Sequence, residues 1–194
     1  TIRVGHKRLT IGSAVRRNKQ NVLRLIMHEI ESHMLQRHNV LQQNNPLVAL
    51  RKIHEKDLYA EGVAVYNEIV SGTITQKAYE LYILRLEAAA NRHLSFRELY
   101  DLMRESVPKK KAFVITYRIK RGMTNTKLSG GFPKDAAYLL GYKEVLEYVS
   151  RGGSIDMLYI SPNPELGQLL LKYDLLPTNG YATPRFYEHQ VLLT

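Results

Sequence analysis

The sequence predicts a mainly α-helical fold, arranged as one domain over residues 1–194. Apolar residues recur at helical spacing over several long stretches, Ser and Thr residues stand where these stretches begin, and Gly or Pro residues stand where they end. The chain has 194 residues, of which 44% are hydrophobic, so it can bury one sizeable core.

The first long helix is expected from about Ala14 to His38, with Ser13 as its N-cap and Asn39 at its end. A second helix is expected from about Glu55 to Val70, because Ser71-Gly72 follows it as a stop signal.

Thr75 is expected to cap a third helix that runs to about Asn91. Ser95 and Glu98 form an S-x-x-E capping box for a fourth helix, which ends before Pro108. The β-branched residues in 112–120 favour a strand by propensity, but the helical surroundings favour a helix, which we expect.

The C-terminal part begins with a polar, glycine-rich connection over 122–132, the kind of loop on which functional residues often lie. Pro133 is placed to begin a helix that ends near Ser150. Ile155–Ile160 is expected as a short strand, which would be the one small β element, and Pro164–Tyr173 as a helix. The remaining tail to Thr194 is expected to be extended coil.

The first helix contains His28-Glu29-Ile30-Glu31-Ser32-His33, an H-E-x-x-x-H pattern. In the usual zinc-protease helix, H-E-x-x-H places two histidines on one face, where they share a metal, while the Glu acts on the water. The spacing here is five, and five residues turn about 500°, so a regular helix would point the imidazoles about 140° apart. A π-bulge would return His33 to the side of His28, and the motif therefore predicts one.

The chain has seven histidines, so the alternative is that two of them flank an acid by chance. A third ligand would favour a zinc site over this alternative. Glu61 in the second helix is the candidate, because its neighbours Ala60, Gly62, Val63 and Ala64 are small or apolar. A carboxylate in such an interface needs a cation or metal, and Gly62 would let two helices approach closely. The alternative is a partly exposed Glu whose neighbours pack.

These two motifs combine with a third that includes Arg121-Gly122, the segment Gly130-Gly131-Phe132-Pro133-Lys134-Asp135, Tyr138 and Gly141. In this order the motifs resemble the microtubule-associated tyrosine carboxypeptidases and their bacterial relatives, which are named for a QEGLA motif. The resemblance spans about Ile11 to Pro184. Animal members remove a C-terminal tyrosine from tubulin, and that substrate is not implied for the bacterial members.

The resemblance implies a zincin-like helical metallopeptidase in which His28, His33 and Glu61 bind zinc and Glu29 is the catalytic base. The sequence departs from the family pattern near the ligands but not at them. Glu31-Ser32 stands where Gly-Thr is common, and Ala60-Glu61-Gly62-Val63 replaces the Q-E-G-L form.

A carboxypeptidase also needs a cation for the terminal carboxylate of its substrate and a donor for the oxyanion. Arg121 and Lys134 are the candidate cations, and Tyr138 is the candidate donor. The alternative is that Lys134 serves the first turn of a helix and Arg121 is surface charge. Glu68 follows Glu61 by one heptad and is a candidate for the hydrogen-bond partner that orients a ligand imidazole.

The composition limits which residue types can bind a metal and which classes of partner are expected. The absence of cysteine leaves histidines and carboxylates to hold Zn²⁺, and it fits a cytoplasmic protein. No apolar run approaches 20 residues, so no transmembrane helix is expected. A net charge of +10 favours an acidic peptide or tail as partner, or a solvated basic face; no nucleic-acid motif is seen. The chain begins at Thr1, so we expect an N-terminal part to be missing, and nothing predicts the oligomeric state.

Two functions remain open at this point. The first is a zinc metallo-carboxypeptidase that removes C-terminal residues, tyrosine or another aromatic, from peptides or proteins. Its mode of cleavage stays open, because the five-residue spacing is similar to that of dipeptidyl peptidase III, which cuts at the other terminus. The second is a non-catalytic, basic helical module for binding or regulation, in which a metal is absent or structural.

Overall fold

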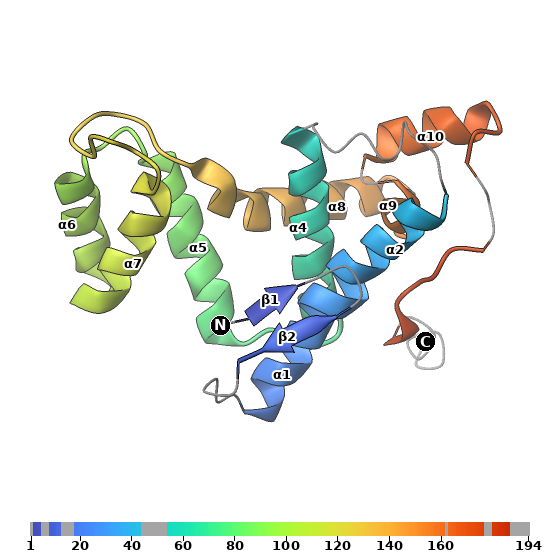
Figure 1. The fold of residues 1–194 in the computed structure, drawn as a ribbon, viewed down its shortest axis with the longest axis horizontal. Helices are drawn as coiled ribbons and strands as arrows, with labels where there is room; N and C mark the ends of the chain where they lie inside the picture. Colours follow the sequence, from blue (N-terminus) through green and yellow to red (C-terminus); the bar gives the residue numbers. More distant parts are fainter. Residues whose placement is uncertain are drawn as a thin grey trace. The chain divides into compact units, whose positions relative to one another are not determined.

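The computed structural model describes residues 2–4, 8–12, 18–43, 54–161, 163–176 and 180–186, and it is mainly helical, as predicted (Figure 1). These residues belong to two compact units. The first comprises Thr1–Ile74 with Gly141–Thr194, and the second comprises Thr75–Leu140. That residues 1–194 act as one catalytic domain stays a prediction.

The metal motif lies in the first unit, on a continuous helical segment made of α1 (Lys19–Leu25), η1 (Ile26–Met34) and α2 (Leu35–Gln42). The expected cap Ser13 lies outside the described residues, and Asn18 caps α1 by accepting a hydrogen bond from the N–H of Asn21 at 2.9 Å. The expected end at Asn39 is wrong. The buried Asn39 amide donates to the carbonyl of Tyr159 at 3.1 Å, so tertiary contacts hold the residue within α2.

Helix α4 (His54–Val70) packs against η1 and carries Glu61. It also approaches the part of α8 (Ala137–Ser150) that belongs to this unit, at Gly62 and Gly141. A Cβ atom on Gly141 would lie 2.0 Å from the carbonyl oxygen of Leu58, so only glycine allows this contact. The close helix approach predicted from Gly62 is therefore present.

The expected strand at Ile155–Ile160 is wrong, because Met157–Ile160 forms the short helix α9. All four residues of α9 are buried, and a short buried apolar run has the same pattern in a strand and in a helix. A small β element occurs instead near the N-terminus, where β1 (Ile2–Val4) pairs antiparallel with β2 (Leu9–Ile11).

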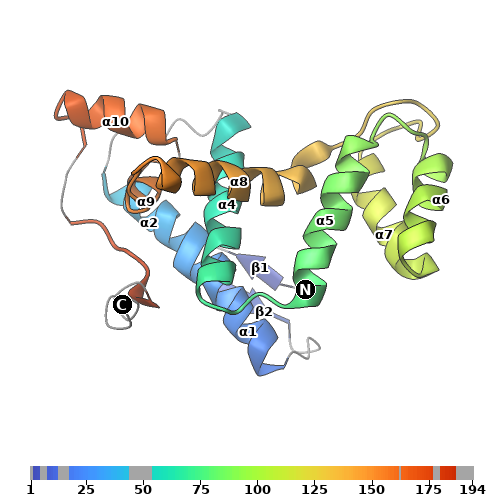
Figure 2. The same ribbon diagram turned by 180° about the vertical axis from the view of Figure 1, so that it is seen from behind.

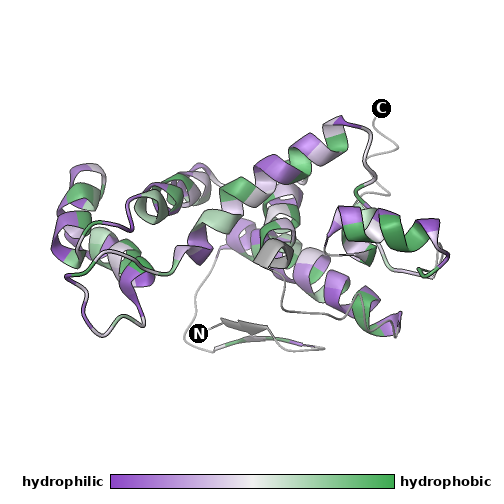
Figure 3. Ribbon diagram, turned by 90° about the horizontal axis from the view of Figure 1, so that it is seen from above, coloured by the Kyte–Doolittle hydropathy of each residue, from purple (hydrophilic) through white to green (hydrophobic). Residues whose placement is uncertain are grey.

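A core cluster of the first unit is formed by residues of α4, α8 and α9 that are buried against one another: Val63, Val145, Leu158 and Tyr159. Helix α10 (Pro164–Lys172) follows, close to its expected range. Hydrophilic and hydrophobic residues are interspersed along the helices, as amphipathic segments require (Figure 3).

The second unit contains α5 (Gln76–Ala90), α6 (Phe96–Ser106), α7 (Lys109–Lys120), η2 (Pro133–Ala136) and the first residues of α8. Figure 2 shows α5, α6 and α7 side by side. Thr75 caps α5, and Ser95 and Glu98 form the predicted capping box on α6. The expected helix over 112–120 is confirmed, because α7 buries Ala112, Ile115 and Ile119 in the core of this unit.

Asp135 in η2 is a buried carboxylate between two arginines. Arg118 donates two hydrogen bonds to it, at 2.5 and 2.8 Å, and Arg85 lies 3.5 Å away. Burial alone would raise the pKa of Asp135, but the bonds from Arg118 and the charges of both arginines hold it below its usual value.

The side chain of Lys120 hydrogen-bonds to the loop that precedes η2. Its buried ammonium group donates to the carbonyl oxygens of Arg92, Leu128 and Gly130 at 2.8, 3.3 and 2.7 Å.

Across the parts of the chain that the structure describes, no helix is both long enough and apolar enough to cross a bilayer.

Candidate metal centre

The predicted π-bulge is confirmed, and it extends over the nine residues of η1. The N–H of Leu35 bonds to the carbonyl of Ile30, five residues earlier, which is the hydrogen bond that defines a π-helix. The wider turn places two residues five apart on one face. The imidazoles of His28 and His33 consequently meet edge to face, with ring centroids 5.0 Å apart.

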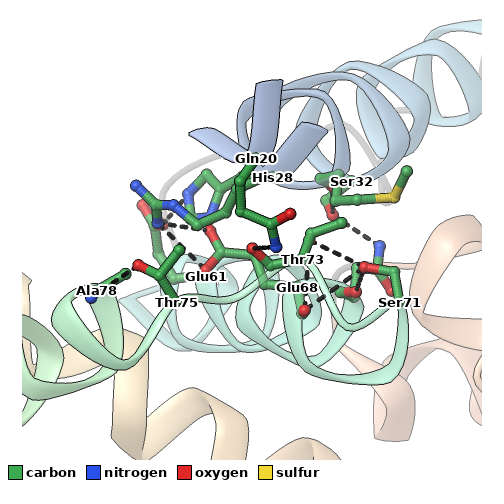
Figure 4. Close-up of polar contacts among 12 residues, drawn as sticks. Gln20, His28, Ser32, Glu61, Glu68, Ser71, Thr73, Thr75 and Ala78 are labelled. Atoms are coloured by element: carbon green, nitrogen blue, oxygen red, sulfur yellow. Dashed lines mark hydrogen bonds and ion pairs between the residues drawn. The ribbon is translucent and has the colours of Figure 1, made fainter. Parts of the chain in front are cut away.

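Glu61 from α4 completes a three-residue cluster with His28 and His33, and Figure 4 shows the side chains of His28 and Glu61 beside each other. Its Oε2 atom lies 3.5 Å from Nε2 of His28 and 3.4 Å from Nε2 of His33. One ligand atom from each of the three residues lies within 4.8 Å of the other two. Two ligands at about 2.0–2.1 Å from a tetrahedral zinc ion are about 3.4 Å apart, so these two spacings fit zinc, and so does the donor set.

The cluster is mostly shielded from water but not sealed. His28 and Glu61 are each 9% exposed, while the side chain of His33 keeps 24% exposure. Burial alone would lower the pKa of His28, but the carboxylates of Glu61 and Glu68 raise it to about 9. Burial would likewise raise the pKa of Glu61, but hydrogen bonds from both histidines hold it far below its usual value.

Glu68 lies two turns after Glu61 on α4 and is fully buried. Its Oε1 atom lies 2.8 Å from Nδ1 of His28. A carboxylate accepts only, so Nδ1 of His28 donates to it, and a metal ion would replace the proton on Nε2, which faces Glu61. Nη1 of Arg24 donates to both oxygens of Glu68, at 3.0 and 3.2 Å, and neutralises its charge.

Glu29 follows His28 on η1 and is partly buried. The three remaining candidates, Arg121, Lys134 and Tyr138, all belong to the second unit. The Arg121 guanidinium lies 4.7 Å from the centre of the Phe132 ring. Tyr138 stacks on Tyr82 at 4.8 Å, and Lys134 is exposed. Their roles stay predictions.

Sequence reasoning missed four residues around the centre: Arg24, Ser32, Asn67 and Tyr159. A signal existed for Arg24, because it precedes His28 by four residues and so lies on the same helix face. Tyr159 approaches Asn67 across 92 positions of sequence, and no local pattern marks such a pair.

Comparison with known proteins identifies a family for the chain. The family model for microtubule-associated tyrosine carboxypeptidases matches residues 1–169, and that range contains both the metal cluster and the later Gly-Gly-Phe-Pro-Lys-Asp segment. No curated protein matches the sequence. Since the family match covers most of the sequence, the chain belongs to the microtubule-associated tyrosine carboxypeptidase family.

Proposed function

We propose that the protein is a zinc carboxypeptidase that removes a C-terminal residue, tyrosine or another aromatic, from a peptide or protein. One observation carries the proposal. The π-helix brings His28 and His33 together with Glu61 at the spacing of zinc ligands, in a chain that belongs to a carboxypeptidase family. A π-helix without a metal site would not by itself account for the clustering of these three side chains.

Zinc held by His28, His33 and Glu61 would polarise the scissile carbonyl and lower the pKa of a water molecule. Glu68 and Arg24 prepare the site for the ion, because the bond to Nδ1 keeps Nε2 of His28 directed at it. Glu29 acts as the general base: its carboxylate accepts a proton from the attacking water and later passes it to the leaving amine.

We also propose roles for three residues of the third sequence motif. Arg121 binds the terminal carboxylate through a charge-assisted pair of hydrogen bonds, with Lys134 as a further cation and Tyr138 as the oxyanion donor. The net charge of +10 supports an acidic peptide or tail as the preferred substrate. A cytoplasmic location stays a prediction.

The experiment begins with metal quantitation on purified protein, which is expected to find one zinc per chain. A peptide library with varied C-termini is then incubated with the protein and read by mass spectrometry. Loss of single C-terminal residues is expected, with a preference for aromatic ones. Removal of the zinc by a chelator should stop the reaction.

The matched variants are Glu29→Gln and Glu31→Gln, which make the same chemical change two residues apart on η1. Glu29→Gln should retain zinc and lose about 10²–10⁴-fold in kcat, the usual contribution of a general base. Glu31→Gln should retain both. Full turnover in Glu29→Gln would refute the mechanism, and a wild-type protein without metal would favour the binding or regulatory module.

A further inference from the structure

The metal helix changes its hydrogen bonding at Glu31. In an α-helix the N–H of Leu35 would bond to the carbonyl of Glu31, four residues earlier. It bonds instead to the carbonyls of Ile30 and Ser32. A helical carbonyl that loses its usual donor away from water needs another one, since a buried acceptor without a partner is costly.

Side chains from two other helices supply such donors. The hydroxyl of Tyr159, on α9, donates to the Glu31 carbonyl at 2.9 Å. The side-chain amide of Asn67, on α4, lies 3.3 Å from the same oxygen. Both side chains therefore contact the Glu31 carbonyl, which the π geometry separates from the N–H of Leu35.

A third side chain joins them. The amide of Asn67 donates to the hydroxyls of Tyr159 at 2.6 Å and Ser32 at 2.7 Å. The hydroxyl of Ser32 donates in turn to the carbonyl of Met27 at 2.7 Å, five residues before it on η1. Ser32, Asn67 and Tyr159 are all fully buried, and we call them the Ser32–Asn67–Tyr159 network.

We propose that the Ser32–Asn67–Tyr159 network holds η1 in its π conformation, so that Ser32, Asn67 and Tyr159 are positioning residues for the metal centre. If the segment relaxed to an α-helix, the N–H of Leu35 would compete with the Asn67 amide and the buried Tyr159 hydroxyl for the two lone pairs of the Glu31 carbonyl. The same change would turn His33 away from His28. The π-helix is therefore stabilised from outside the helix.

Helix α4 carries both a candidate metal ligand and a residue of the network. Asn67 lies six residues after Glu61 on α4, so that helix supplies both a candidate ligand and a contact that holds the opposite pair of histidines in place. The inference rests on the proposed function only in that it concerns the same three-residue site. The geometry that it predicts exists without metal.

The test uses Tyr159→Phe and Ser32→Ala, each of which deletes one hydroxyl group of the network. Matched controls delete similar groups in the same unit. Tyr148 packs in the same core cluster as Tyr159 but bonds to Gln168, so Tyr148→Phe is the first control. The hydroxyl of Ser161, also fully buried, donates to the carbonyl of Asn163, so Ser161→Ala is the second.

Two readouts are measured on the full chain. Nuclear magnetic resonance of histidine-labelled, metal-free protein should show contact between the imidazoles of His28 and His33 in wild type and in both controls. The contact should be lost in Tyr159→Phe and Ser32→Ala. Titration with Co²⁺ should show affinity reduced about 10- to 100-fold in these two variants, with an altered absorption spectrum.

The proposal is overturned if Tyr159→Phe, or Ser32→Ala should the first variant not fold, keeps both the imidazole contact and wild-type cobalt binding. Loss of both readouts, with helical content retained and controls unchanged, supports it. If wild type binds no metal, the proposed function fails, while the imidazole contact still decides whether the network positions His33.

Discussion

Gly141→Ala should destabilise the protein strongly, because it adds a methyl group where two helix backbones touch. The new Cβ would lie 2.0 Å from the carbonyl oxygen of Leu58 and 2.9 Å from the backbone nitrogen of Gly62. Both atoms belong to α4, so no side-chain rotation relieves the overlap, and the helices must separate. Such overpacking costs about 3 kcal/mol or more where the backbone cannot yield.

Alanine recovers up to about 1 kcal/mol of this by its better helix propensity. The net loss is therefore about 2 kcal/mol or more, which corresponds to a Tm lower by about 4–8 °C in a chain of this size. Urea denaturation followed by circular dichroism measures the free energy of unfolding. Because Gly62 adjoins Glu61, a displaced α4 should also weaken zinc binding, which is measured by titration.

Gly167→Ala is the comparison. Its Cβ would meet the sulfur of Met157 at 2.6 Å and the Cβ of Ser161 at 2.9 Å, both of which are side-chain atoms, and the thioether can move. Its cost should be smaller than that of Gly141→Ala. An unfolding free energy of Gly141→Ala equal to that of wild type, or a larger loss for Gly167→Ala, would refute the reasoning from backbone contact.

Three further outcomes are expected. Zinc at 100 times its Kd should stabilise the protein by about 2.7 kcal/mol, seen as a higher Tm; His33→Ala should abolish the effect, and the exposed His38→Ala should not. Arg121→Gln should raise KM about 10- to 100-fold through loss of a charge-assisted bond, measured against Arg97→Gln, whose side chain is 82% exposed. The depressed pKa of Asp135 contributes stability above pH about 4 that is lost as pH falls through the folded-state value, so Asp135→Asn should be less stable at neutral pH and show a shallower acid transition in urea melts.

Much of the candidate site could be predicted from local sequence. Two histidines five residues apart cannot share a metal on a regular helix, so the prediction of a shared metal carried with it the prediction of a π distortion, and η1 has one. The small residues around Glu61 likewise indicated a carboxylate in a tight interface, and α4 and α8 do meet at Gly62 and Gly141. Both inferences rest on helix geometry, which depends only on neighbours in sequence.

Other features could not be predicted in this way. Ile155–Ile160 is expected as a strand, but a short apolar run has the same pattern in a strand and in a buried helix, and Met157–Ile160 is a buried helix. The expected helix end at Asn39 failed because a side-chain amide that often ends helices is bonded here to Tyr159, across 120 positions.

The sequence by itself determined the helical class, the capping of α5 and α6, the family and the requirement for a π turn at the metal motif. Tertiary structure alone decided how that turn is held, since the donors to the Glu31 carbonyl come from α4 and α9. The reason is physical. Helix periodicity and capping are properties of adjacent residues, whereas a buried carbonyl receives its substitute donors from whichever segments the fold packs against it.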